Sequence, residues 1–402
     1  DGEHQPFFQP PFTPACRAIA YVTDESGWSR LVVRDLATDE RRTMGADGEH
    51  AEHGTPAWIQ GLRTYGILPD SDYAFVARSE AGFVDGCVVG FGSGEAAVHA
   101  AFHEVYTDVE QPAVNPVTGA VAAIVAAPTT PTRVVVADAL AESARVVRRA
   151  ASENVPREAL SVPEAVSWPS FGGAPVHGLF YPPSSARFES EGRPPLVVLV
   201  HGGPTSQATA TWSPQAQFLA TRGYAVLAVN YRGSTGYGRA YMLALRGQWG
   251  VADVEDCVSG AQALAREGRV DGGRMAIMGG SAGGYTVLQT MINYPEAFAA
   301  GISMFGVANQ FTLVAETHKF EERYTDSLIG ALPEAAAVYR ERSPQFRAGE
   351  IRRPMAIFQG EIDEVVPKSQ SDCIVDSLKR RNIPHEYHVY AGEGHGCRKA
   401  ET

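Results

Sequence analysis

The sequence GGSAG, at residues 279–283, constrains the fold of this chain more than any other feature. A short apolar run of strand length, residues 274–278, precedes it, and apolar residues recur at helical spacing from Val287 to Ile292. A serine between a strand and a helix lies on a sharp turn that lifts its hydroxyl above the sheet, and flanking glycines let the backbones approach closely. The pattern therefore predicts a nucleophile elbow at Ser281. A glycine-rich turn without chemistry fits these residues alone, so the rest of the chain must decide.

The carboxyl-terminal part of the chain alternates short apolar runs with segments of helical periodicity. The apolar runs are too short for helices and predict buried parallel strands; they are residues 196–200, 225–229, 275–278, 301–305 and 355–358. Between them, Val254, Val258 and Ala261 follow Val251 on one helical face. This alternation predicts a doubly wound α/β fold.

Two further side chains complete a catalytic pattern. In α/β hydrolases an acid and then a histidine follow the serine, each in a loop after a later strand. Asp363 follows the apolar run that ends at 358, and His395 follows residues 387–390, which have the pattern of a last strand. Glycines flank His395, which suits a catalytic loop better than a packed core. The sequence therefore predicts an α/β-hydrolase domain with a triad of Ser281, Asp363 and His395.

An anion site for the tetrahedral intermediate is predicted beside the serine. The sequence HGGP, at residues 201–204, directly follows the first central strand. Glycines there leave a backbone N–H free to point at the developing oxyanion, and the residue after the nucleophile supplies the second donor. We therefore expect the N–H groups of Gly203 and Ala282 to form the oxyanion hole. This chemistry requires no cofactor.

The amino-terminal part contains three similar segments, residues 18–40, 73–95 and 120–141, each reading as strand, turn and strand. Their spacing of roughly 50 residues is typical of propeller blades. A β-sandwich with coincidentally similar hairpins is the alternative. We expect a partial β-propeller-type segment of about three blades over residues 1–150, a linker over 151–175 and the catalytic domain over 176–402.

Composition limits the kinds of binding partner and the cellular compartment that we expect for this protein. A formal net charge of −12, without a cluster of Lys or Arg, argues against nucleic acid. No apolar run has the length of a membrane span, so we expect no membrane partner. The 5 cysteines are scattered, which favours a reducing, cytoplasmic compartment and neither disulfides nor zinc. His50 and His53 lie in a polar turn without a helix to align them, so we expect no metal site.

Five motifs in order resemble the prolyl oligopeptidase family of serine peptidases, especially its acylaminoacyl peptidase and dipeptidyl aminopeptidase-like branch. They are HGGP at 201–204, NYRGSTGYG at 230–238, GGSAGGY at 279–285, Gly360-x-x-Asp363-x-x-Val366-Pro367, and GHG at 394–396. The resemblance implies hydrolysis of short peptides through an acyl-enzyme. It also implies that Ser281 is the nucleophile, that His395 is the general base and acid, and that Asp363 orients the imidazole.

The chain departs from the family pattern in two places. Cys397 follows the GHG motif where relatives usually carry an aromatic residue, and about three blades stand where the family has seven or eight. Because a propeller closes only with about four to eight blades, we expect the chain to be part of a longer protein. As it stands, the chain should either associate through its open blades, as a homo-oligomer, or accept larger substrates than its relatives do. A carboxylesterase of the same fold remains an alternative function. A non-catalytic propeller interaction protein is an alternative of another class.

Overall fold

The computed structural model describes residues 7–45, 48–56, 61–69, 72–92, 96–103, 105–138, 141–189, 191–317, 319, 321–399 and 402. The chain divides into two compact units. One, here called the β unit, comprises residues 1–163, 209–218 and 235–242. The other, here called the α/β unit, comprises residues 164–208, 219–234 and 243–402.

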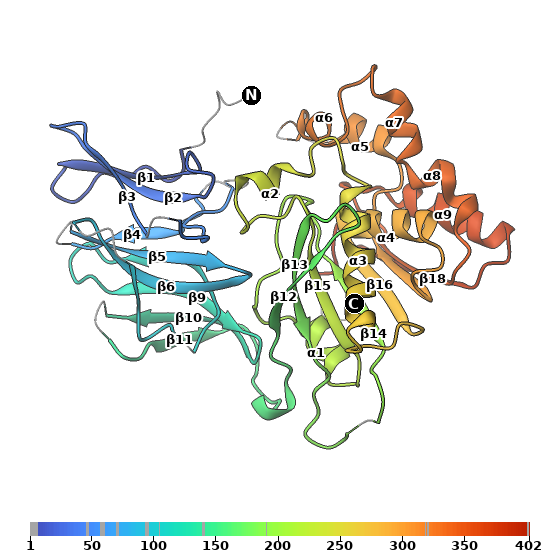
Figure 1. Cartoon of the computed structure of the whole chain (residues 1–402), viewed down its shortest axis with the longest axis horizontal. Helices are drawn as coiled ribbons and strands as arrows, with labels where there is room; N and C mark the ends of the chain where they lie inside the picture. Colours follow the sequence, from blue (N-terminus) through green and yellow to red (C-terminus); the bar gives the residue numbers. More distant parts are fainter. Residues whose placement is uncertain are drawn as a thin grey trace. The chain divides into compact units, whose positions relative to one another are not determined.

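The β unit contains three antiparallel sheets whose strands follow one another in chain order (Figure 1). The first sheet has β1 (Ala18–Thr23), β2 (Arg30–Asp35) and β3 (Arg41–Thr43). The second has β4 (Tyr65–Ile67), β5 (Tyr73–Glu80), β6 (Phe83–Gly90) and β7 (Ala96–Val98), and the third has β8 (Asp108–Val114), β9 (Val121–Ala127), β10 (Thr130–Ala137) and β11 (Arg145–Arg149). The short helix η1 (Arg157–Ala159) follows. The three predicted repeats are the hairpins β1–β2, β5–β6 and β9–β10. Residues 93–95 and 139–140 of these repeats lie outside the described residues.

The middle sheet packs against both of its neighbours, because side chains alternate across a strand. On β5, Val76 faces a core that it shares with Val22 and Leu31 of the first sheet. The preceding residue, Phe75, points to the opposite face of the sheet and belongs to a second core with Val135 of the third sheet. Three meander sheets stacked through such cores form a propeller-type segment. The unit has three such sheets where about three blades were expected, and two sheets of a sandwich do not describe it.

The α/β unit is built on an eight-stranded sheet in the order β12-β13-β15-β14-β16-β17-β18-β19 (Figure 1). Six neighbouring strands are parallel, namely β15, β14, β16, β17, β18 and β19. β12 and β13 extend the sheet beside β15 in antiparallel fashion. The strands are β12 (Glu164–Pro169), β13 (Pro175–Tyr181), β14 (Leu196–Val200), β15 (Ala225–Asn230), β16 (Met275–Gly280), β17 (Ala300–Met304), β18 (Met355–Gly360) and β19 (His385–Tyr390). The five predicted parallel strands are thus confirmed.

Helices connect these strands. They are α1 (Pro214–Ala220), α2 (Arg239–Leu243), α3 (Ala252–Arg266), α4 (Ala282–Asn293), α5 (Gln310–Glu316), α6 (Tyr324–Leu328), α7 (Ala336–Glu341), α8 (Pro344–Arg347), η2 (Ala348–Glu350) and α9 (Lys368–Arg380). The predicted face of α3 is buried, with Val254, Val258 and Ala261 at most 1% exposed. Among the residues that the structure describes, no helix has both the length and the apolarity needed to cross a bilayer.

The domain boundaries differ from those expected. The segment expected to link the domains, residues 151–175, contains β12, which pairs with β13 in the sheet of the α/β unit. Trp168 of β12 is 5% exposed, and its Nε1–H donates to Ser259 Oγ of α3 at 3.1 Å. The α/β unit therefore begins at Glu164 rather than at residue 176. Residues 209–218 and 235–242 were expected in the catalytic domain, but they group with the β unit.

Candidate active site

The turn between β16 and α4 carries Ser281 in a backbone conformation that non-glycine residues rarely adopt. Its φ is 55° and its ψ is −123°. A Cβ at Gly283 would overlap the Val200 carbonyl oxygen, and one at Gly279 would lie 2.6 Å from the Gly283 carbonyl carbon. Only glycine allows β14, β16 and α4 to approach so closely here. The predicted nucleophile elbow is therefore present, with its serine at the carboxyl end of the central strands.

Ser281, His395 and Asp363 come from three loops and meet in one chain of hydrogen bonds. His395 Nε2 lies 2.9 Å from Ser281 Oγ, and His395 Nδ1 lies 2.9 Å from Asp363 Oδ2. An ionised carboxylate only accepts, so Nδ1 carries the hydrogen and Nε2 is left to accept the proton of the serine hydroxyl. The Asp363 side chain is 0% exposed and that of His395 is 23% exposed. This arrangement can transfer the serine proton to the imidazole.

The acid loop keeps Asp363 ionised although it is buried. Burial favours the neutral carboxyl, but hydrogen bonds from His395 and from the N–H groups of Val366 and Val365 oppose it, and the pKa of Asp363 is held below its ordinary value. The two N–H groups donate to Oδ1 at 2.8 and 2.9 Å. Gln359 Nε2 donates to Oδ2 at 3.3 Å and to the Val366 carbonyl at 3.1 Å. Gln359 was not predicted from the sequence, where its only signal was that a polar residue stands near the end of an apolar strand.

The histidine loop is held on two sides. Phe305 meets the His395 ring edge-on, with the ring centroids 4.9 Å apart. Glu393 accepts hydrogen bonds from the N–H groups of Lys399 at 2.9 Å and Arg398 at 3.1 Å. These N–H groups lower the pKa of Glu393 below its ordinary value. The residues after His395 are therefore folded back onto its own loop.

The HGGP loop and the start of α4, which carry the two predicted oxyanion donors, adjoin the serine. A Cβ at Gly202 would be 3.6 Å from Ser281 Cβ, so the HGGP loop adjoins the nucleophile. Gly203 has a φ of 121°, and a Cβ there would be 2.9 Å from the Thr205 nitrogen, so glycine is required. Ala282 is the first residue of α4, where N–H groups have no acceptor within the helix.

The loop after β15 supports this HGGP loop. That supporting role was not predicted from the sequence. The His201 ring stacks on Tyr231 with centroids 4.3 Å apart, and the Tyr231 hydroxyl donates to the Pro204 carbonyl at 3.0 Å. Desolvation lowers the pKa of His201 to about 4, so the ring is neutral at physiological pH. Its Nδ1 lies 2.7 Å from the Gly202 carbonyl and donates to it, which leaves Nε2 to accept from Ser234 Oγ at 2.8 Å. The hydrogen-bonding roles of His201 are thereby determined.

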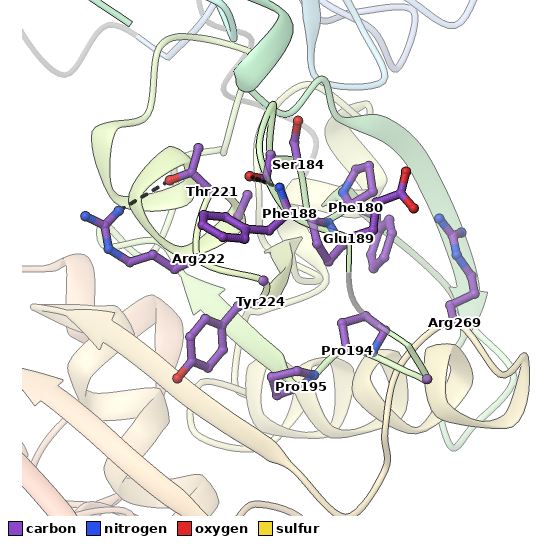
Figure 2. A pocket seen from close by; sticks show the side chains of 16 residues that line it. Phe180, Ser184, Phe188, Glu189, Pro194, Pro195, Thr221, Arg222, Tyr224 and Arg269 are labelled. Atoms are coloured by element: carbon purple, nitrogen blue, oxygen red, sulfur yellow. Dashed lines mark hydrogen bonds between the residues drawn. The ribbon is translucent and has the colours of Figure 1, made fainter.

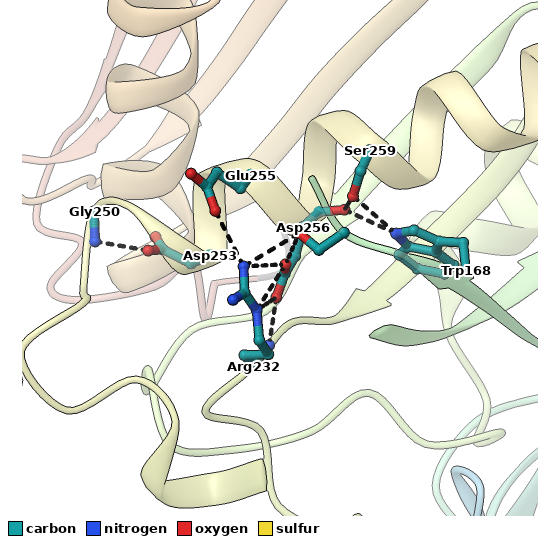
Figure 3. A network of polar contacts seen from close by, with 8 residues as sticks. Trp168, Arg232, Gly250, Asp253, Glu255, Asp256 and Ser259 are labelled. Atoms are coloured by element: carbon teal, nitrogen blue, oxygen red, sulfur yellow. Dashed lines mark hydrogen bonds and ion pairs between the residues drawn. The ribbon is translucent and has the colours of Figure 1, made fainter. Parts of the chain in front are cut away.

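A buried polar network fastens the same loop to α3 (Figure 3). Asp256, which is 0% exposed, accepts from the Arg232 backbone N–H at 2.7 Å and from Arg232 Nε at 3.0 Å. Ser170 Oγ donates to the same carboxylate at 2.7 Å. A buried charge is tolerated only when it is paired and hydrogen-bonded in this way. The network therefore stabilises the position of Arg232 rather than taking part in chemistry.

Asp253, also on α3, joins that helix to the nucleophile helix. It accepts from Gly250 N–H at 2.6 Å and from Thr286 Oγ1 at 2.6 Å (the former drawn in Figure 3), and Thr286 lies one turn after Ala282. Burial raises the pKa of Asp253 to about 6. The folded protein thus holds a proton on Asp253 at pH values where an unfolded chain, with a carboxyl pKa of about 4, has lost it.

We expect Asp253→Asn to raise the free energy of unfolding at pH 8. Stability contributed by a carboxyl of raised pKa is full below about pH 4 and is lost as the pH rises through about 6, which costs about 3 kcal/mol at pH 8. The amide of the variant can still accept from the Gly250 N–H and can donate to Thr286 Oγ1. The Thr286 hydroxyl can then donate to the Ala282 carbonyl, which lies 3.1 Å away in the wild-type structure. The expected gain is on the order of 1–3 kcal/mol at pH 8 and about half as large at pH 5.

Urea unfolding of both proteins at the two pH values measures this gain. Asp39→Asn serves as a control, because the Asp39 side chain is 69% exposed and should change stability little. Destabilisation by Asp253→Asn at pH 8 would show that the ionised form is the favoured one.

An open hollow of the α/β unit lies elsewhere (Figure 2). Its volume is about 1300 Å³, and prolines and aromatic rings line much of it, including Pro194, Pro195, Phe188 and Tyr224. Pro195 immediately precedes β14 and Tyr224 immediately precedes β15. The hollow is thus at the amino ends of these strands, whereas Ser281, Asp363 and His395 follow the carboxyl ends of β16, β18 and β19. Chemistry in a parallel α/β sheet belongs at the carboxyl ends.

Comparison with known proteins shows which proteins this chain is similar to. Residues 210–402 match the prolyl oligopeptidase family. The chain is 37% identical over 229 residues to dipeptidyl aminopeptidase BIII of Pseudoxanthomonas mexicana, covering 55% of this chain and 33% of that enzyme. It is 33% identical over 215 residues to the acylamino-acid-releasing enzyme of Sus scrofa, covering 52% of this chain and 29% of that enzyme.

Solved structures extend the similarity to the β unit. A puromycin-hydrolyzing peptidase of Mycobacterium tuberculosis superposes with a TM-score of 0.90 and 33% sequence identity, covering 99% of this chain and 59% of that one. The chain therefore spans about a third of the length of the curated relatives above and somewhat over half of this structure.

Proposed function

We propose that this chain hydrolyses peptide bonds in short peptides through an acyl-enzyme, because residues 210–402 match the prolyl oligopeptidase family. The observation that carries the proposal is the continuous link from Ser281 Oγ through His395 to Asp363, with both distances at 2.9 Å. Ser281 acts as the nucleophile, His395 as general base and acid, and Asp363 as the group that orients the imidazole.

The steps follow from these positions. Ser281 Oγ attacks the scissile carbonyl carbon while its proton passes to His395 Nε2. The carbonyl oxygen becomes an oxyanion that accepts hydrogen bonds from the N–H groups of Gly203 and Ala282. Collapse of the intermediate breaks the C–N bond, and the leaving amine takes the proton from Nε2. Water then attacks the acyl carbon while His395 Nε2 accepts its proton. The ester C–O bond to Ser281 breaks as Nε2 returns that proton to Oγ, which releases the acid and restores the enzyme.

The names of the relatives support a peptide substrate. They are a dipeptidyl aminopeptidase, an acylamino-acid-releasing enzyme and a puromycin-hydrolyzing peptidase. We propose short peptides as the substrate class on this basis, without a preferred side chain. A homo-oligomeric state and a cytoplasmic location stay predictions from the sequence.

Turnover of peptide anilides beside short-chain nitrophenyl esters tests the function. A peptidase should cleave the anilides with a kcat/KM that is at least comparable to that for the esters, and Ser281→Ala should lose both activities. Turnover of esters alone would favour the carboxylesterase alternative, since the same triad serves both bonds. Failure of a fluorophosphonate probe to label Ser281 would favour the non-catalytic alternative instead.

A further inference from the structure

The segment Thr235–Met242, here called the anchored segment, packs in the β unit although both of its flanks lie in the α/β unit. It follows Ser234 directly and carries most of α2. A segment of eight residues is too short to hold a position by itself, so its contacts within the β unit decide where it lies.

Three groups of the β unit hold the anchored segment. Glu52 Oε1 accepts the Gly238 backbone N–H at 2.9 Å. The Gly27 carbonyl accepts the Arg239 backbone N–H at 2.8 Å. Asp24 accepts Arg239 Nη1 with both carboxylate oxygens, at 2.7 and 2.8 Å. Hydrogen bonds to charged groups are the stronger kind, so the two carboxylates dominate this attachment.

The carboxylates of Glu52 and Asp24 are both buried where they hold the anchored segment. Glu52 is 6% exposed, and its second oxygen accepts the Ser29 N–H at 2.7 Å. Asp24 is 7% exposed and faces Arg239. Gly238 has a φ of 86°, and a Cβ there would be 3.1 Å from the Gly27 carbonyl oxygen, so the two backbones are in close contact. Removing either carboxylate leaves its donors without a buried acceptor.

The residue before the anchored segment supports the oxyanion loop. Ser234 is 0% exposed, and its Oγ lies 2.8 Å from His201 Nε2. His201 is the first residue of the HGGP loop that carries Gly203. One peptide bond thus separates the anchored segment from the hydroxyl that fixes His201.

We propose that Glu52 and Asp24 are positioning residues for the proposed hydrolysis, because they hold the anchored segment and thereby keep Ser234 against His201 and the oxyanion donor of Gly203 in place. The inference rests on the proposed function. Neither carboxylate touches the substrate in this scheme. Their removal should therefore weaken stabilisation of the transition state more than ground-state binding.

Glu52→Ala and Asp24→Ala are each expected to lower kcat about 10- to 100-fold, with KM changed by less than about threefold, since small displacements of a catalytic donor have effects of this size. Glu52→Gln keeps an acceptor for Gly238 and should recover most of the loss. Joining Asp24→Arg to Arg239→Asp should recover part of the loss seen with Asp24→Arg alone. Adding Glu52→Ala to Ser234→Ala should lower kcat no further, because both act through His201.

Glu153→Ala is the matched control. Glu153 pairs with the mostly buried Arg133 in the same unit, with Arg133 Nε donating at 2.9 Å, and it does not contact the anchored segment. This variant should leave kcat within about twofold at a comparable loss of stability. An equal fall in kcat for Glu153→Ala and Glu52→Ala would overturn the proposal, because the effect would then be general destabilisation.

Hydrogen–deuterium exchange separates the inference from the function. In Glu52→Ala, amides of residues 235–242 and 201–206 should exchange faster than in the wild type, and those of the sheet strands should not. Slower labelling of Ser281 by a fluorophosphonate should accompany the change. If the wild type cleaves no peptide, the proposed function fails, while the exchange result still stands. If exchange at 201–206 and kcat are both unchanged in Glu52→Ala, the inference fails and the function stands.

Discussion

Ser281→Ala and His395→Ala are each expected to lower kcat by about 10⁶-fold, and the double variant should be no worse than either single one. The two side chains act as one unit, because the serine attacks only while the imidazole takes its proton. Their 2.9 Å contact is the geometry this step requires. Burst and steady-state kinetics on a peptide anilide measure the loss, with active sites counted in the wild type by fluorophosphonate titration.

His388→Ala is the control for the histidine. His388 lies in β19, and its side chain is 47% exposed beside Glu386. Its removal should leave kcat within about twofold. A loss of kcat for His388→Ala comparable to that for His395→Ala would show that His395 had been wrongly assigned as the general base.

Asp363→Asn is expected to lower kcat by about 10⁴-fold, somewhat less than loss of the nucleophile. The Val365 and Val366 N–H groups hold Oδ1, so the amide nitrogen takes the place of Oδ2, which faces His395 Nδ1. The amide donates where the carboxylate accepted. His395 is then forced to accept at Nδ1 and to carry its hydrogen at Nε2, where it cannot take the serine proton.

The neighbouring acids test this assignment. Glu361 accepts the Gly392 N–H at 2.9 Å, and both Glu361 and Glu364 are exposed. Glu361→Gln and Glu364→Gln should therefore retain kcat within about threefold. An essential Glu361 would contradict the assignment, because the predicted order of serine, acid and histidine would then rest on a different side chain. Unchanged circular dichroism in Asp363→Asn shows that the loss is not one of folding.

Much of the α/β unit and all three residues of the proposed triad were predictable from the sequence. The strand before Ser281, the helix after it and the glycines on either side are determined by neighbours in the chain, through apolar periodicity and through the close approach that only glycine permits. Asp363 and His395 were found because strand order puts the loops after successive parallel strands at one edge of the sheet. The hairpins of the β unit were predictable for the same local reason.

The buried polar contacts around the proposed site and the boundary of the α/β unit were not predictable from the sequence. Glu52 reads as one acid in a polar turn, yet it is 6% exposed and accepts from Gly238, 186 residues away. The start of the α/β unit at Glu164 depended on the pairing of β12 with β13 rather than on composition. The sequence alone determined the elements and the candidate reacting groups, because periodicity and turn chemistry act between close neighbours. Only the tertiary structure decided which polar side chains are buried and what they hold, since burial and hydrogen-bond partners depend on segments that meet only after folding.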